Sequence, residues 1–286
     1  MRANTATNKE TARAKINLTL HVGAAQEDEF HPLHSLVVFA HIGDELSLQM
    51  SKTETAPRLN ISGPFADNLP NGADNLIMQA YGKFSTRRDA KPVFNLVKNL
   101  PIASGIGGGS ADAAATIRLM SNHDQNLRPS PKTLSDLGAD IPACLLSKTC
   151  LMEGIGERLT PLPDLGQVAA LLVNPGVSIS TAAVFKTFDK TGSSSQFHLP
   201  PSSLLEMAQG GHNDLQETAI SIEPVIHTVL ESITAQEGCQ LARMSGSGAT
   251  CFGVFPDIED AQNAAKDIKA KYADWWCMPT MLGDTP

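Results

Sequence analysis

Residues 100–115, LPIASGIGGGSADAAA, form the stretch that decides how this chain folds. Four glycines fall in the five positions from Gly105 to Gly109, and a serine and an alanine-rich run follow them. The preceding residues 93–100 are rich in β-branched and apolar side chains, which predicts a strand. The following residues 111–120 are strong helix formers with no glycine or proline, which predicts a helix.

A glycine loop between a strand and a helix is suited to holding a phosphate group. Glycine lets the backbone adopt positive φ and lets an anion approach the N–H groups without a Cβ in the way. The first N–H groups of a helix have no intrahelical partner and lie at the positive end of its dipole. Ser110 would lie near that end, where it can cap the helix or donate to a phosphate. The alternative is a helix start that is merely rich in glycine, but four glycines without Asn or Pro among them exceed what a simple turn needs.

The loop does not match two common phosphate-binding sequences. A P-loop carries a lysine after its last glycine, and no lysine follows here. The dinucleotide fingerprint G-x-G-x-x-G fails because Ser110 stands at its third glycine when counted from Gly105. The loop is similar instead to the P-x-x-x-G-[LI]-G-G-G-S-[SA] loop of the GHMP kinases, which wraps the phosphates of ATP. The resemblance implies contacts with ATP along the loop, from Pro101, Ala103, Ser104, Gly105, Ile106, Gly107, Gly108, Gly109 and Ser110.

Length and composition are typical of a globular protein with room for two domains. The 286 residues are 42% hydrophobic and 18% charged, with a net charge of −8. An acidic chain is a poor candidate for general nucleic-acid binding, so we expect no nucleic-acid partner. The five cysteines are scattered with no C-x-x-C pair, which favours free thiols over a zinc site or a disulfide framework. No apolar run reaches the length of a membrane span, and residues 1–12 lack the apolar core of a signal peptide, so we expect a cytoplasmic protein with no membrane partner.

Residues 15–22 alternate apolar and polar side chains, which predicts a strand with one buried and one polar face. Lys15 and Asn17 then point to the same, polar face. On pattern alone, a solvated surface lysine is the commoner interpretation. A second short motif, G-A-D-I-P at residues 138–142, places Asp140 next to a proline that suits the first turn of a helix. Helix capping explains an aspartate here as well as a catalytic role does.

These motifs together resemble one family within the GHMP kinases, the 4-diphosphocytidyl-2-C-methyl-D-erythritol kinases of the non-mevalonate (MEP) isoprenoid pathway. The family carries both A-K-I-N-L, found here at residues 14–18, and G-A-D-I-P. The resemblance implies that Asp140 takes the proton from the C2 hydroxyl of the substrate, that Lys15 lies beside that hydroxyl, and that Asn17 contacts the substrate. The implied reaction transfers phosphate from ATP with Mg²⁺ carried by ATP. Ser110 lies near that ion, and no metal ligand of the protein is assigned.

The resemblance also extends to residues that would hold the cytosine ring. The family has D-G-Y-H where this chain has D-E-F-H, so Glu29 stands in place of a glycine and leaves the shape of this loop open. Without the resemblance, a half-buried Phe at a polar hairpin tip and a core-packing Phe further along the chain are the commoner interpretations. The implied substrate contacts besides Asn17 are Phe30, His31, Thr181 and Phe185. The implied contacts on the adenine side of ATP are Asn75 and Lys98.

Other stretches give predictions of local structure. Residues 244–250, M-S-G-S-G-A-T, are similar to a superfamily motif that forms a second small-residue loop closing against the first; a plain hairpin turn is the alternative. We further predict a hairpin of strands 35–42 and 45–50 with a turn at 43–44, Asp74 as the N-cap of a helix at 75–81, a surface connection at 191–209, a helix at 221–237 and a final helix at 257–272.

The resemblance spans most of the chain and implies a two-domain GHMP kinase fold of the mixed α/β (α+β) class. Residues 1–160 are expected to form an ATP-binding and catalytic domain, ribosomal-S5-domain-2-like, and residues 161–286 a ferredoxin-like C-terminal domain. ATP and diphosphocytidyl-methylerythritol, the expected small-molecule partners, would bind in the cleft between them, in a monomer or homodimer. Two alternatives stay open: another GHMP kinase, for homoserine or a mevalonate derivative, and a non-catalytic nucleotide-binding relative.

Overall fold

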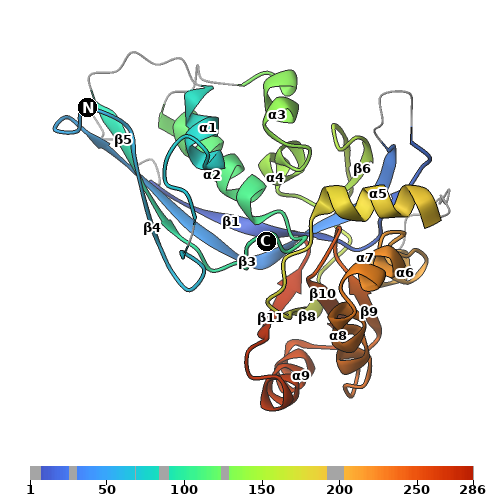
Figure 1. Ribbon diagram of the computed structural model, residues 1–286. Coiled ribbons are helices and arrows are strands. Elements are labelled where there is room, and N and C mark those ends of the chain that lie inside the picture. The colour runs from blue at the N-terminus through green and yellow to red at the C-terminus, as the bar shows by residue number, and fades with distance from the viewer. Residues whose placement is uncertain are drawn as a thin grey trace. The chain divides into compact units, whose positions relative to one another are not determined.

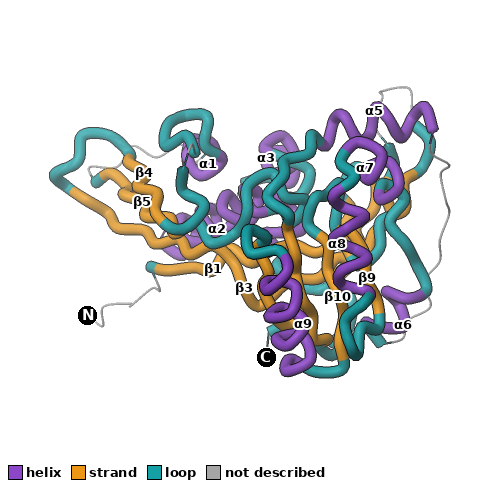
Figure 2. The backbone as a smooth tube through the Cα atoms, turned by 60° about the horizontal axis from the view of Figure 1, so that its bottom comes forward, coloured by secondary structure: helices purple, strands orange, loops and turns teal. Residues whose placement is uncertain are grey.

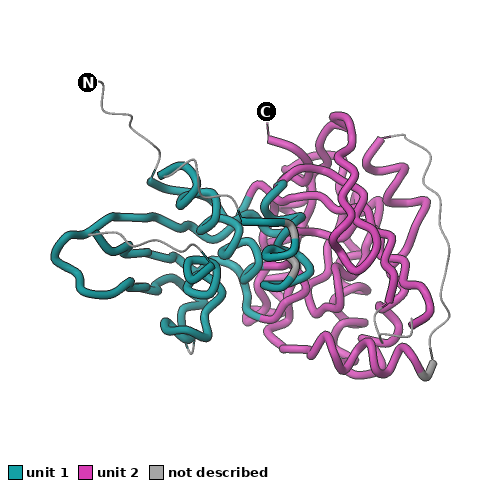
Figure 3. Tube along the Cα trace, turned by 90° about the horizontal axis from the view of Figure 1, so that it is seen from above, with its two compact units in different colours: residues 1–14, 42–102, 108–146 teal, residues 15–41, 103–107, 147–286 magenta. Residues whose placement is uncertain are grey.

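The computed structural model describes residues 8–25, 31–67, 69–83, 90–123, 129–191 and 203–285. Strands and helices alternate in mixed order along the chain (Figure 1), which confirms the predicted mixed α/β class. The elements form two compact units, each assembled from separated stretches (Figure 3). The first unit takes its described residues from 1–14, 42–102 and 108–146, and the second from 15–41, 103–107 and 147–286. The predicted domains 1–160 and 161–286 stay a prediction.

The described residues of the first unit form a small sheet and four helices. In the sheet, β5 (Lys91–Val97) pairs in parallel with β4 (Arg58–Ser62) and antiparallel with the last residues of β3 (Leu33–Ser51). The helices are α1 (Leu76–Gly82), α2 (Gly108–His123), α3 (Pro131–Leu137) and α4 (Ile141–Leu146). The helix α2 packs against α1 and α4, and its buried alanines allow this close approach. Strand β1 (Lys9–Asn17) pairs with β3, and both strands contribute residues to both units.

The described residues of the second unit include four antiparallel strands in the order β11–β8–β10–β9 (Figure 1). These are β8 (Val168–Asn174), β9 (Leu241–Met244), β10 (Cys251–Phe255) and β11 (Trp276–Leu282). Its helices are α5 (Thr181–Thr191), α6 (Leu204–Gln209), α7 (Gln216–Ile222), α8 (Val225–Thr234) and α9 (Ile258–Lys271), of which α8 and α9 contact the sheet. Figure 2 shows α8 beside β9 and β10. Apolar side chains from the sheet and from α7, α8 and α9 form one buried core. A second antiparallel group joins β2 (His21–Val22), the first residues of β3, β6 (Cys150–Gly154) and β7 (Arg158–Pro161).

The predicted hairpin at residues 35–50 is wrong, because β3 runs without a turn from Leu33 to Ser51. A Cβ at Gly43 would collide with the carbonyl group of Ala12, so the glycine serves a close approach of two backbones. Asp44 is fully buried and hydrogen-bonded, which is the opposite of an exposed turn residue. The dipeptide Gly-Asp is typical of a turn, but here Gly43 packs against the backbone of Ala12 and Asp44 is buried.

Three further predictions of local structure need correction. The N-cap of α1 is Asn75 rather than Asp74, and its side chain accepts a hydrogen bond from the N–H of Ile77. The end of the predicted surface connection forms α6, which begins with a capping box of Ser203 and Glu206. The predicted helix at 221–237 is two helices, because Pro224 cannot continue α7 and instead precedes α8. The final helix is confirmed as α9, with its N-cap one residue before it.

Candidate functional site

The glycine loop connects β5 to α2, as predicted. Its backbone has positive φ at Ala103 (48°), Gly105 (75°) and Gly107 (65°). Helix α2 begins at Gly108, three residues earlier than predicted, so the Gly108-Gly109-Ser110 run forms its first turn. The first N–H groups of a helix have no intrahelical acceptor. These residues therefore present backbone donors at the positive end of a long helix, which suits an anion.

The second small-residue loop packs directly on the glycine loop, which confirms that prediction. The N–H of Thr250 donates to the carbonyl oxygen of Ser104 at 3.1 Å, and the Ser245 hydroxyl donates to the carbonyl oxygen of Gly105 at 3.2 Å. A Cβ at Gly105 would lie 2.6 Å from the carbonyl oxygen of Ser245, and a Cβ at Gly246 would lie 2.6 Å from that of Gly105. Glycine is required on both sides because any side chain would separate the two backbones.

The polar face that carries Lys15 and Asn17 is buried, so the interpretation of Lys15 as a solvated surface lysine is wrong. Lys15 is 3% exposed and Asn17 is 1% exposed. The backbone N–H of Lys15 donates to the carbonyl oxygen of Ile106 at 2.9 Å, which ties this strand to the glycine loop. Its ammonium lies near the Cys150 thiol: burial raises the pKa of Cys150 to about 11, and the Lys15 charge acts in the opposite direction.

Asn17 is held in place and still offers an acceptor. Its N–H donates to the Ser245 hydroxyl at 3.1 Å and its side-chain Nδ2 donates to the Ser35 hydroxyl at 2.7 Å. Its Oδ1 is buried with no hydrogen-bond partner among the described residues. A buried acceptor without a partner is costly, so this oxygen is suited to a hydroxyl or amine of a ligand.

Asp140 directly precedes α4 in the first unit, and its carbonyl oxygen accepts from the N–H of Cys144 at 2.9 Å. Gly138, two residues before it, approaches the start of α2, since a Cβ there would lie 3.9 Å from the Ser110 Oγ. The G-A-D-I-P segment and the first turn of α2 are thus neighbours. Lys15 belongs to the second unit and Asp140 to the first, and their convergence on one hydroxyl stays a prediction.

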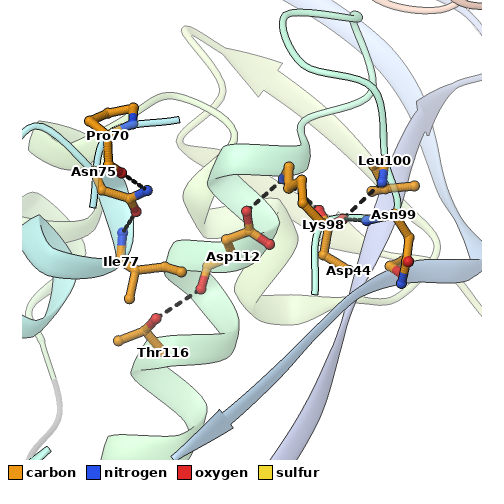
Figure 4. A network of polar contacts seen from close by, with 10 residues as sticks. Asp44, Pro70, Asn75, Ile77, Lys98, Asn99, Leu100, Asp112 and Thr116 are labelled. Carbon is orange, nitrogen blue, oxygen red and sulfur yellow. Dashed lines mark hydrogen bonds and ion pairs between the residues drawn. The ribbon is translucent and has the colours of Figure 1, made fainter. Parts of the chain in front are cut away.

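Lys98 forms a buried network with two carboxylates that sequence reasoning missed (Figure 4). Its Nζ lies 2.5 Å from Asp44 Oδ2 and 2.6 Å from Asp112 Oδ2. Burial alone would lower the pKa of the Lys98 ammonium, but the two carboxylates outweigh it and raise that pKa. Burial raises the pKa of the Asp112 carboxyl, and Lys98 opposes this. Asn75, the other residue predicted to lie near adenine, caps α1 and donates from Nδ2 to the carbonyl oxygen of Pro70 at 2.8 Å.

His31 lies among residues of the second unit that were predicted to bind substrate. Its ring centroid is 5.2 Å from that of Phe185 on α5. Its Nδ1 lies 2.8 Å from the carbonyl oxygen of Gly23, and its Nε2 lies 2.9 Å from Asp189 Oδ1 on the same helix. Thr181, the first residue of α5, shares a 2.8 Å hydrogen bond with the hydroxyl of Ser247. Phe30 lies outside the described residues.

The residues that the sequence did not reveal form hydrogen bonds with residues far away along the chain. Asp44 is 54 residues from Lys98, and Ser245 is 228 residues from Asn17. An aspartate within the alanine-rich run of α2 was the one local signal, since a charged side chain there is exceptional on a face that packs against other helices. No helix among the described residues is long and apolar enough to cross a membrane.

Comparison with known proteins gives concordant matches in both halves of the chain. Residues 68–152 match the family model of the GHMP kinases N terminal domain, and residues 201–274 match that of the GHMP kinases C terminal. The 4-diphosphocytidyl-2-C-methyl-D-erythritol kinase of Roseobacter denitrificans is 44% identical over 281 residues, covering 95% of this chain and 92% of that protein. The chain belongs to the GHMP kinase family.

Further relatives and solved structures are similar to this chain. The enzyme of the same name from Dinoroseobacter shibae is 45% identical, covering 95% of this chain and 93% of that protein. A crystal structure of 4-(cytidine 5'-diphospho)-2C-methyl-D-erythritol kinase matches with a TM-score of 0.78 at 29% identity, covering 97% of this chain and all of that one. A homoserine kinase from Cytophaga hutchinsonii matches with a TM-score of 0.65 at 16% identity, covering 98% of this chain and 96% of that one. The last likeness concerns the GHMP kinase fold alone.

Proposed function

We propose that this protein transfers the γ-phosphate of ATP to the C2 hydroxyl of 4-diphosphocytidyl-2-C-methyl-D-erythritol, giving the 2-phosphate and ADP. The observation that carries the proposal is the 44% identity over nearly the whole chain to a kinase named for this substrate. The packed pair of glycine loops agrees with a phosphate donor. We further propose that the protein acts in the cytoplasm on the MEP pathway, as a monomer or homodimer.

Asp140 and Lys15 are proposed to act on the same hydroxyl. Phosphoryl transfer requires the protein mainly to position the reactants in line and to stabilise charge. Asp140 takes the proton of the attacking hydroxyl, and the nearby ammonium of Lys15 keeps the carboxylate ionised and favours the alkoxide. Gly138, two residues before Asp140, approaches the Ser110 hydroxyl in the first turn of α2, and this supports the role because the phosphate to be transferred would lie at that helix start.

The phosphates of ATP are proposed to bind along the glycine loop. The contributing residues are Pro101, Ala103, Ser104, Gly105, Ile106, Gly107, Gly108, Gly109 and Ser110. Backbone N–H groups would hold the β- and γ-phosphates, with Asn75 and Lys98 on the adenine side. Mg²⁺ carried by ATP would neutralise their charge. The Ser110 hydroxyl, in the first turn of α2, is a hard oxygen ligand, which fits this ion.

The diphosphocytidyl substrate is proposed to bind through Asn17 and through the residues around α5. The unpartnered Oδ1 of Asn17 suits a substrate donor. Phe185 and Phe30 would enclose the cytosine ring, and His31 would form a hydrogen bond with the edge of that ring. Thr181, at the start of α5, would also contact the substrate. The present pairing of His31 with Asp189 means that this ring exchanges one partner when it reads the base.

An ATP-consumption assay with the diphosphocytidyl substrate tests this function. The expected result is substrate-dependent release of ADP, inhibited by CDP, with no turnover of homoserine or mevalonate. Activity that CDP does not inhibit and that is higher with homoserine or mevalonate would instead favour another GHMP kinase. ATP binding without turnover of any polyol would favour a non-catalytic relative.

A further inference from the structure

A buried charged network joins the chain segments that precede and follow the phosphate loop. Lys98, Asp44 and Asp112 are 3%, 0% and 5% exposed. Figure 4 shows the Lys98 ammonium between the two carboxylates, reaching from the end of β5 to α2. Buried ion pairs add little net stability, because the desolvation of the charges offsets their attraction. The network therefore calls for an explanation other than stability alone.

Asp44 fixes the start of the loop. Its Oδ1 accepts from the backbone N–H of Asn99 at 2.6 Å and from that of Leu100 at 2.9 Å. The Asn99 side chain in turn donates to the carbonyl oxygen of Gly43 at 3.2 Å. A buried carboxylate that accepts from two successive N–H groups holds the backbone in one conformation just before Pro101.

Lys98 and Asp112 fix the end of the loop. Asp112 is the fifth residue of α2 and is tied through Lys98 to the same Asp44. The network also touches the first residue of the helix, since a Cβ at Gly108 would lie 3.3 Å from Lys98 Nζ and 3.7 Å from Asp44 Oδ2. One ammonium thus couples the chain that enters the loop to the helix that leaves it.

We propose that Lys98, Asp44 and Asp112 are positioning residues that hold both ends of the phosphate loop, so that its N–H groups are set for ATP before ATP binds. The inference rests on the proposed function and deepens it. Donors fixed in advance cost no ordering when the ligand arrives, so the network acts on ATP affinity. Two of the three ammonium donors of Lys98 are hydrogen-bonded to these carboxylates, and Asp44 and Asp112, which are not among the proposed ATP contacts, act on ATP through the loop.

The substitution Asp112→Asn tests the proposal, because Asp112 is not among the residues predicted to touch ATP. It keeps the shape of the side chain and leaves Lys98 paired with Asp44. We expect the Kd of Mg-ATP, measured by calorimetry, and the KM for ATP to rise by about tenfold. The KM for the alcohol substrate should stay within about twofold of wild type. Amide exchange should quicken in peptides covering residues 98–112 but not in those covering β5.

The matched control is Asp136→Asn, which removes the carboxylate of an exposed ion pair with Lys132 in the same unit. That variant should bind ATP as wild type does. If Asp112→Asn melts at a lower temperature yet binds ATP as wild type does, the network is only structural and the proposal is wrong.

If Asp112→Asn does not fold, Asp44→Asn carries the test, since Asp44 is not among the proposed ATP contacts and an amide oxygen can still accept from the N–H groups of Asn99 and Leu100. Weakened ATP binding by the folded Asp44→Asn variant supports the proposal, and unchanged binding overturns it. Direct ATP binding also separates this inference from the proposed function: a wild-type protein that binds ATP but does not phosphorylate the diphosphocytidyl substrate refutes the function and leaves the positioning test intact.

Discussion

Asp140 is the residue on which the proposed chemistry depends most directly. Its position fits two roles that sequence alone could not separate, since it directly precedes α4 and belongs to the segment whose Gly138 approaches the first turn of α2. A capping residue stabilises its helix by about 1 kcal/mol, whereas a catalytic base changes the rate by orders of magnitude. The two roles therefore predict different measurements.

We predict that Asp140→Asn lowers kcat by about 10²-fold or more while the Kd of Mg-ATP stays within about twofold of wild type. An amide keeps the shape and can still accept a hydrogen bond, but it cannot take a proton. Steady-state kinetics and calorimetry on the same preparation give both values. Asp136→Asn again serves as the control, and wild-type turnover by Asp140→Asn would leave Asp140 with the capping role alone.

His21, the first residue of β2, is buried and gives the stability of the protein a pH dependence. It is 1% exposed, and burial lowers its pKa from 6.5 to about 4. The charges of His212, His34 and Arg243 act in the same direction, while Asp214 opposes them. The unfolded chain takes up a proton below pH 6.5 and the folded protein does not until about pH 4, so stability is present above pH 6.5 and is lost as the pH falls towards 4.

We predict that His21→Gln, which does not titrate, loses less stability than wild type between pH 7.5 and pH 5. The difference should be ~1–2 kcal/mol, because each unit of pKa difference corresponds to about 1.4 kcal/mol. Urea unfolding at the two pH values measures it. His227→Gln, at an exposed helix position, is the control and should follow wild type. Parallel losses in wild type and His21→Gln would show that another group governs the acid sensitivity.

At the scale of elements, the structure depends on the contact between the two small-residue loops. We predict that Gly105→Ala destabilises the protein by about 2 kcal/mol or more and weakens ATP binding. The backbone there has φ 75°, which costs an L-residue about 1–2 kcal/mol, and the added Cβ would lie 2.6 Å from the carbonyl oxygen of Ser245.

Chemical denaturation with nucleotide titration checks this prediction. The matched control is Gly72→Ala, since a Cβ at Gly72 would meet no atom within 4 Å. That variant should stay within about 0.5 kcal/mol of wild type. Equal stability of the two variants would contradict the packing of one loop on the other.

Elements and motifs that depend on contiguous residues were predictable from the sequence. The loop–helix unit around Gly108 and the final helix α9 follow from local propensity and capping. The single strand β3 was not predictable from the sequence, because its path through Gly43 and Asp44 is decided by residues that lie tens of positions away. Burial of the face that carries Lys15 was also missed, since alternation shows that a face is polar but not whether other parts of the chain cover it.

At the scale of the whole molecule, the residues proposed to bind and to catalyse are divided between the two compact units. Lys15, Asn17 and the loop residues 103–107 belong to the second unit, whereas Asp140 and the start of α2 belong to the first. The family membership came from motifs spread along the chain, and it is confirmed by matches in both halves. The network of Lys98 required the structure, because no motif links its three residues.

The central claim is that Lys15 and Asp140 act on one hydroxyl, and a double-mutant cycle on kcat tests it most directly. Residues that act as a unit give strongly non-additive losses. Lys15→Met and Asp140→Asn should each lower kcat by about 10²-fold or more. The kcat of the double variant should be little lower than that of the less active single variant. Losses that multiply in the double variant, or full activity in either single variant, would contradict the account.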